Sequence, residues 1–143
     1  MSALPESFVP VVADLQSSGY RTSIRTLPES STDDMQRRAG LFGQIPRDDS
    51  LLFEVDINEQ PIGMVSVHPG LLPPQQIKWI ADQISTAIAE NMRIDGKSVT
   101  WPPCPDGNMP MKPEVIAGQA AWVSPYPGST MTPVPIGHWG SPS

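Results

Sequence analysis

The sequence has little cysteine, little positive charge and no long apolar run. A single cysteine, Cys104, among 143 residues cannot form an internal disulfide, so nothing demands an oxidising compartment. No apolar run approaches the roughly 18 residues of a membrane-spanning helix, and the N-terminal segment lacks the basic start and apolar core of a signal peptide. We therefore expect a cytoplasmic protein without a membrane span.

The scarcity of positive charge argues against a nucleic-acid-binding protein. Nine Lys and Arg stand against 15 Asp and Glu, which gives a net charge of −6. The basic residues are scattered along the chain, and only Arg37 and Arg38 are adjacent. Proteins that bind nucleic acid carry a basic patch or stripe that meets the phosphates. The composition therefore disfavours nucleic acid as a partner.

Catalytic motifs are also missing. The sequence contains no glycine-rich phosphate loop, no serine nucleophile elbow and no His–Glu metal motif. Its two histidines, His68 and His138, and its one cysteine are too few for a structural zinc site, which needs four Cys or His ligands. We expect no cofactor and no bound metal, and a non-catalytic role is favoured.

Two segments within the first 100 residues have the apolar periodicity of amphipathic helices. Residues 5–18 form the first, and Gly19 supplies its stop. Residues 73–94 form the longer one, with prolines at its start and Gly96 at its exit. A third, short helix is predicted for residues 32–38. The apolar stripes consist of Phe8, Val11, Val12 and Leu15 in the first helix and of Ile77, Ile80, Ala81, Ile84, Ala87, Ile88 and Met92 in the long one.

Three further segments favour β-strands. Residues 20–27 are rich in β-branched and aromatic side chains, residues 51–58 alternate apolar and polar, and residues 62–68 follow the turn sequence Asn-Glu-Gln-Pro. Because so short a connection cannot make a parallel crossover, the last two strands should form an antiparallel hairpin. Residues 1–100 are therefore expected to fold as an α+β domain, a small antiparallel sheet with one long amphipathic helix packed on it.

The composition changes at residue 101. Ten of the 18 prolines fall in residues 101–143, where only three residues are charged. The pattern of residues 114–123 predicts a hairpin that turns at Ala117–Gly118, and the remainder has the composition of a proline-rich tail. We expect residues 101–143 to form an appendage: a degenerate ribbon-like hairpin followed by a proline-rich arm.

Aromatic and methionine side chains are concentrated in this C-terminal arm. Segments rich in these residues and poor in charge are typical of protein–protein contacts. Internal packing against the sheet is the other interpretation of the same residues, and both can hold. The predicted partner-binding residues are Trp101, Trp122, Tyr126, Met131 and Trp139.

Two functions follow as hypotheses. The first is a non-catalytic accessory or adaptor protein that docks on a larger protein partner, or self-associates, through the C-terminal arm. The alternative is a small enzyme or ligand-binding domain that uses Glu54 and Asp56, with or without Cys104 or His68. Glu54 and Asp56 lie two residues apart on one predicted strand, so their carboxylates share a face.

The C-terminal sequence also has the spacing of a zinc ribbon, in which cysteines in two turns hold the metal. Cys104 stands in such a turn, but Gly107 and Ser124 occupy positions where further cysteines would be expected. With these features the segment resembles the C-terminal part of short uncharacterised actinobacterial proteins. The spacing and the missing ligands together predict a ribbon-like hairpin held by packing in place of metal. The matching residues are Trp101, Pro102, Cys104, Pro105, Trp122, Val123, Pro125, Ile136 and Gly137.

Overall fold

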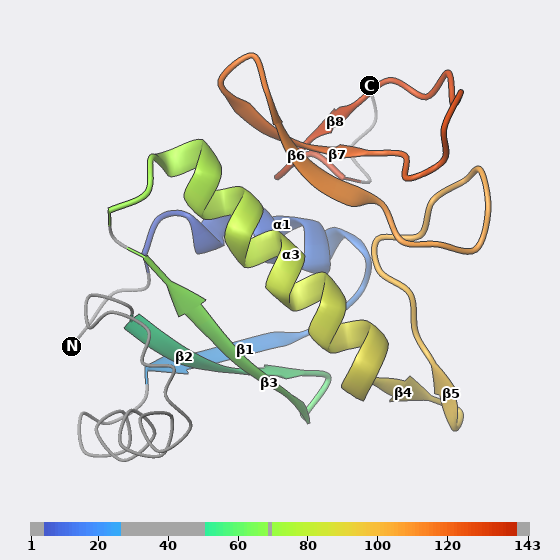
Figure 1. Ribbon diagram of the computed structural model, residues 1–143. Helices are drawn as coiled ribbons and strands as arrows, with labels where there is room; N and C mark the ends of the chain where they lie inside the picture. Colours follow the sequence, from blue (N-terminus) through green and yellow to red (C-terminus); the bar gives the residue numbers. More distant parts are fainter. Residues whose placement is uncertain (1–4, 27–50, 69, 140–143) are drawn as a thin grey trace, which may run out of the picture.

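The computed structural model describes residues 5–26, 51–68 and 70–139 (Figure 1). The helix predicted for residues 32–38 lies outside these described residues. Neither helix within the described ranges has the length and apolar character to cross a membrane. The elements are α1 (Phe8–Ser17), β1 (Thr22–Thr26), β2 (Leu51–Ile57), β3 (Gln60–Val67), α3 (Pro73–Asn91), β4 (Arg93–Ile94), β5 (Lys97–Ser98), β6 (Lys112–Ile116), β7 (Gln119–Val123) and β8 (Val134–Pro135).

The first sheet is antiparallel, with the strand order β1-β2-β3. Alternation along β2 directs Phe53, Val55 and Ile57 into the core. The long helix α3 crosses this sheet and contacts β3, and α1 packs against α3 (Figure 1). The predicted α+β fold, a small antiparallel sheet with a long helix packed on it, is confirmed.

Three two-residue turns join neighbouring strands, and in each both central residues have positive φ. They are Asn58–Glu59, Asp95–Gly96 and Ala117–Gly118. This is the geometry of type I′ turns, whose twist matches that of a β-hairpin. The Ala117–Gly118 turn lies where the sequence predicts it. The return strand is expected to begin at residue 62, but β3 begins at Gln60, so the turn before it is shorter than predicted. The long helix is expected to run to residue 94, but α3 ends at Asn91, and Gly96 lies in the β4–β5 turn and not at the helix end.

The C-terminal residues share the hydrophobic core of the rest of the chain. The second sheet, with the order β6-β7-β8, packs against α3, so that this helix lies between the two sheets (Figure 1). Trp101, Met111 and Trp122 are fully buried in one cluster with the core residues of β2 and β3. The two indole rings meet edge to face, with centroids 5.3 Å apart. Residues 101–139 are therefore built into the fold and are not the appendage that their composition suggests.

Candidate functional site

Two of the five predicted partner-binding residues lie inside the protein. Trp101 and Trp122 are both 0 % exposed. The indole N–H of Trp101 donates to the Ser18 hydroxyl at 2.9 Å, and that of Trp122 donates to the Asp14 carboxylate at 2.8 Å. No partner can reach either ring of the folded chain. The prediction that these two residues bind a partner is wrong, because their aromatic surface completes the core.

The other three predicted contacts are held by the protein itself. Tyr126, Met131 and Trp139 are partly buried and pack against the same core. The hydroxyl of Tyr126 accepts a hydrogen bond from the backbone N–H of Met109 at 2.9 Å, and the backbone N–H of Trp139 donates to Asp14 at 2.8 Å. The part of these three residues in partner binding stays a prediction.

Asp14 is a carboxylic acid with 0 % exposure on the inner side of α1. Its Oδ2 accepts the indole N–H of Trp122 and the backbone N–H of Gly137, and its Oδ1 accepts the backbone N–H of Trp139, all at 2.8 Å. We call this group the Asp14 clamp. The donors lie 108 to 125 positions further along the chain, so the clamp ties both β7 and the C-terminal residues to α1.

The sequence carries a signal for this clamp, although Asp14 is not among the predicted site residues. Asp14 falls between Val11 and Leu15 on the apolar stripe of the first helix. A charged residue at such a position is rarely buried unless a specific partner accompanies it. The position therefore indicates a buried polar contact, although not its partners.

The ionisation of Asp14 gives a testable pH dependence. Burial raises the pKa of Asp14 above its ordinary value of 3.8, and the three N–H donors and the charge of His138 lower it by less. The folded state thus holds this proton more tightly than the unfolded state, so the contribution of Asp14 to stability falls as the pH rises from 3.8 through the folded pKa. We expect the difference in unfolding free energy between wild type and Asp14→Asn to shrink across that window. Urea denaturation at a series of pH values measures it, and a difference that grows with pH would contradict the assignment.

Cys104 opens a tight turn and is only 4 % exposed. The backbone N–H of Gly107 closes the turn on the Cys104 carbonyl at 3.3 Å. The Cys104 sulfur accepts the Asp106 N–H at 3.4 Å and donates to the Ser124 hydroxyl at 3.5 Å. Ser124 in turn donates to the Asp106 carboxylate at 3.1 Å. The Cys104 turn and the residue that follows β7, Ser124, thus meet through hydrogen bonds.

Within the described residues, the geometry of this cluster does not favour a metal site or an activated thiol. Among the residues that the structure describes, no three Cys, His, Asp or Glu side chains gather as ligands for an ion. The thiol of Cys104 donates its hydrogen bond to the neutral hydroxyl of Ser124, whereas activation of a thiol requires a neighbouring base or cation. We therefore assign Cys104 a structural role in joining the two turns.

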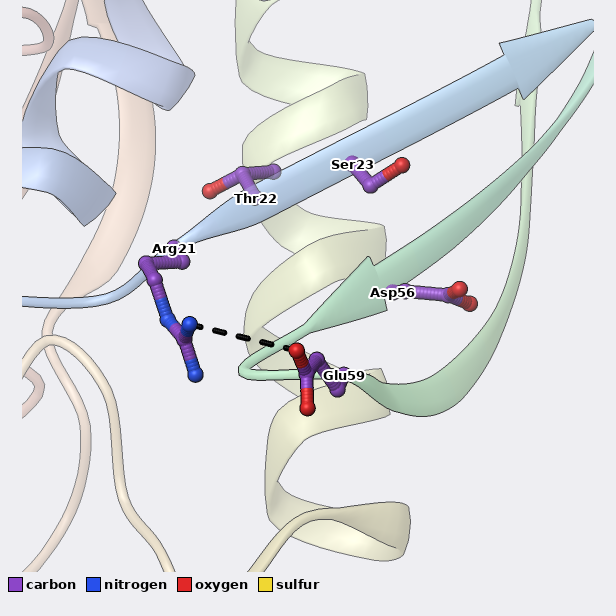
Figure 2. A pocket seen from close by; sticks show the side chains of 5 residues that line it. All are labelled: Arg21, Thr22, Ser23, Asp56 and Glu59. Atoms are coloured by element: carbon purple, nitrogen blue, oxygen red, sulfur yellow. Dashed lines mark ion pairs between the residues drawn. The ribbon is translucent and has the colours of Figure 1, made fainter.

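Glu54 and Asp56 lie together on β2, as predicted, but both are paired. One guanidinium nitrogen of Arg25, on the neighbouring strand β1, lies 3.0 Å from the Glu54 carboxylate and 3.3 Å from that of Asp56. Beside them is a hollow of about 350 Å³, across which Arg21 approaches Glu59 at 3.9 Å (Figure 2). The lining residues are Arg21, Thr22, Ser23, Asp56 and Glu59.

The groups of the alternative hypothesis are therefore not brought together. Neither Cys104 nor His68 lines the hollow beside Asp56. Cys104 is hydrogen-bonded to Asp106 and Ser124, and His68 packs its ring against Trp79, with centroids 5.5 Å apart. A shared catalytic or ligand site of Glu54, Asp56, Cys104 and His68 has no geometric support.

Trp79 is a large aromatic side chain that the fold leaves 40 % exposed, on the outer side of α3. Its indole N–H donates to the Ser66 carbonyl at 2.9 Å, and the His68 ring packs beside it. The indole borders a hollow of about 510 Å³ between α3 and β6, which we call the Trp79 hollow. The other lining residues are Leu71, Gln75, Lys78, Glu114 and Val115. An exposed tryptophan fixed beside a partly apolar hollow is typical of the centre of a protein interface.

Trp79 is likewise absent from the predicted site residues. The available signal is its place in the helix, because Trp79 falls beside the stripe of Ile77, Ile80 and Ile84 that faces the core. A tryptophan off the apolar stripe of an amphipathic helix is directed toward solvent or toward a partner. The periodicity alone thus separates Trp79 from the core residues.

Comparison with known proteins provides no relative from which a function could be transferred. No protein-family model, curated protein or solved structure matches the chain significantly. The resemblance of the C-terminal segment to short actinobacterial proteins therefore stays a prediction. Function is inferred below from the geometry of the described residues.

Proposed function

We propose that this protein is a non-catalytic accessory protein that docks on a larger protein partner through the outer face of α3. The observation that carries the proposal is Trp79, which is 40 % exposed at the edge of the Trp79 hollow. Its hydrogen bond to Ser66 and its contact with His68 fix the ring before a partner arrives. A side chain ordered in advance loses less entropy on binding.

The docking surface in this proposal is centred on α3, with Glu114 and Val115 of β6 at its border, and not on the aromatic residues of the C-terminal arm. Two of the three tryptophan rings of the arm, Trp101 and Trp122, fill the core, and the hydrogen bonds of Tyr126 and Trp139 are made within the chain. The polar groups that could support catalysis are likewise engaged, Glu54 and Asp56 by Arg25 and Cys104 by Ser124. We further propose the cytoplasm as the compartment, because a lone buried thiol needs no oxidising environment.

The substitution Trp79→Ser tests this function. We expect it to reduce the recovery of a stoichiometric partner by about ten-fold or more, because truncating a central interface tryptophan removes about 2 kcal/mol or more of binding free energy. The measurement is affinity capture with the tagged full chain from its native cells, quantified against the wild type. Unchanged denaturation midpoints for the variant would show that the loss is one of binding and not of folding.

A further inference from the structure

The docking face continues past Trp79 into a second hollow, of about 420 Å³, between α3 and β3. We call it the β3–α3 groove. The strand order β1-β2-β3 makes β3 an edge strand, with one side unpaired within its sheet. Such an edge presents backbone N–H and C=O groups with which a further strand can pair.

Side chains of α3 occupy two positions along this edge. The amide of Gln83 accepts the Ser66 N–H at 2.9 Å and donates to the Ser66 carbonyl at 2.8 Å, as a neighbouring strand would. The amide of Asn91 donates to the Ile62 carbonyl at 2.7 Å. Both contacts protect the edge at its ends.

The position between them is open. Outward backbone groups alternate along an antiparallel strand, so the N–H and C=O of Met64 point to the same side as those of Ser66. Within the described part of the chain, no side-chain or turn hydrogen bond engages these two groups. The Met64 side chain is also 45 % exposed. Within the described residues, Met64 of β3 therefore has its outward backbone groups available to pair with an added strand.

The charged residues that line the β3–α3 groove are of one sign. Asp82 and Glu90 line the β3–α3 groove, both are exposed, and no Lys, Arg or His is among its lining residues. Neither carboxylate has an ion pair with another residue of the described ranges. An occupant of complementary charge is therefore basic.

The spacing of the two carboxylates matches an extended chain. Asp82 and Glu90 are eight residues apart on α3, which corresponds to about 12 Å along the helix axis. In an extended strand, residues i and i+4 lie on one face and about 13 Å apart. Two basic side chains at that spacing would each reach one carboxylate, while the backbone between them pairs with Met64.

We infer that the partner segment that docks here is an extended basic strand, with Lys or Arg four residues apart, which adds to β3 at Met64 and lies along α3. This inference rests on the proposed function and names the chemistry of its partner. A second copy of this chain is not the occupant. Arg25 in its β1 and Arg21 just before that strand are exposed at the same spacing, but carboxylates of their own chain already pair with both, at 3.9 Å or less.

The probe for this inference is a short synthetic peptide of alternating valine and threonine with two lysines four residues apart, titrated onto the full chain by fluorescence anisotropy at low salt. We expect binding that weakens about three-fold with Asp82→Asn or Glu90→Gln and about ten-fold with both, since each exposed pair is worth up to about 1 kcal/mol. N-methylation of the peptide residue midway between the lysines should weaken binding about five-fold or more, through the lost backbone hydrogen bond. In the complex, hydrogen exchange at the Met64 amide should slow by about ten-fold.

The controls separate this inference from the function it rests on. Asp95→Asn removes an exposed carboxylate outside the groove and should leave peptide binding unchanged, and a peptide with glutamates in place of the lysines should not bind. Equal binding to wild type and to the double variant, or an unprotected Met64 amide, would overturn the inference. If Trp79→Ser abolishes native capture while the peptide does not bind, docking by α3 stands and the basic strand is refuted. If capture survives Trp79→Ser, the proposed function fails whatever the peptide does.

Discussion

Replacing Asp14 with alanine is expected to lower the free energy of unfolding by about 3–5 kcal/mol. The substitution leaves three N–H donors, from Trp122, Gly137 and Trp139, without the acceptor that each meets at 2.8 Å. Asp14 is fully enclosed, so water cannot replace the carboxylate without opening the structure. The loss therefore exceeds that of an ordinary surface hydrogen bond.

Urea denaturation followed by circular dichroism measures this effect. Gln16→Ala, an exposed change on the same helix, is the matched control and should alter stability by less than about 0.5 kcal/mol. Amide hydrogen exchange at Gly137 and Trp139 should quicken in Asp14→Ala before the rest of the chain is affected. A loss of stability below about 1 kcal/mol would mean that the clamp does not hold the C-terminal residues.

Trp122→Ala is expected to cost about 3–5 kcal/mol, because it removes the largest class of side chain from a fully buried site and leaves a cavity against Trp101. Trp122→Phe retains most of the apolar volume but loses the indole N–H, and should cost about 1–3 kcal/mol. Both values come from equilibrium denaturation of the full chain. A near-neutral Trp122→Ala would restore the view of residues 101–139 as a separate appendage.

The effects of Asp14→Ala and Trp122→Phe on stability should also be coupled. Asp14 and Trp122 share one hydrogen bond, so the effects of Asp14→Ala and Trp122→Phe are expected to sum to about 0.5–3 kcal/mol more than the effect of the double variant. Additive effects would show that the indole and the carboxylate act independently.

The parts of the fold that sequence predicts are those with local signals. The alternation of β2, the stripe of α3 and the Ala117–Gly118 turn each depend on residues close together in the chain, and each is found where expected. The predicted end of α3 is too late, because Gly96 serves a hairpin turn as readily as a helix end. The antiparallel hairpin of β2 and β3 agrees with the prediction, although its turn has two residues and not the four of the predicted Asn-Glu-Gln-Pro turn.

Whether each aromatic residue is buried in the core or exposed to a partner could not be predicted in the same way. Proline and tryptophan in a segment of low charge have the same local composition whether they cover a partner or complete a core. Trp101 and Trp122 complete the core, and Ser18 and Asp14, far away in the sequence, satisfy their indole N–H groups there. Trp79 differs from them by its place on a helix face, and that periodicity is visible in the sequence.

The candidate carboxylates show a similar limit. The sequence places Glu54 and Asp56 on one strand and Arg25 on another, but the pairing register is set by the folded sheet. In the structure Arg25 lies opposite Glu54 and reaches both carboxylates. What looks like a pair of acidic catalytic groups is thereby part of a cross-strand ion pair.

The central claim is that a partner docks on α3 and not on the C-terminal arm, and a paired capture experiment tests it most directly. Trp79→Ser and Met109→Ser each remove one exposed apolar side chain, 40 % and 52 % exposed, from the helix and from the turn of the arm. We expect the stoichiometric partner of the wild type to be lost with Trp79→Ser and retained with Met109→Ser. Loss with Met109→Ser and retention with Trp79→Ser would contradict the claim and return the docking surface to the arm.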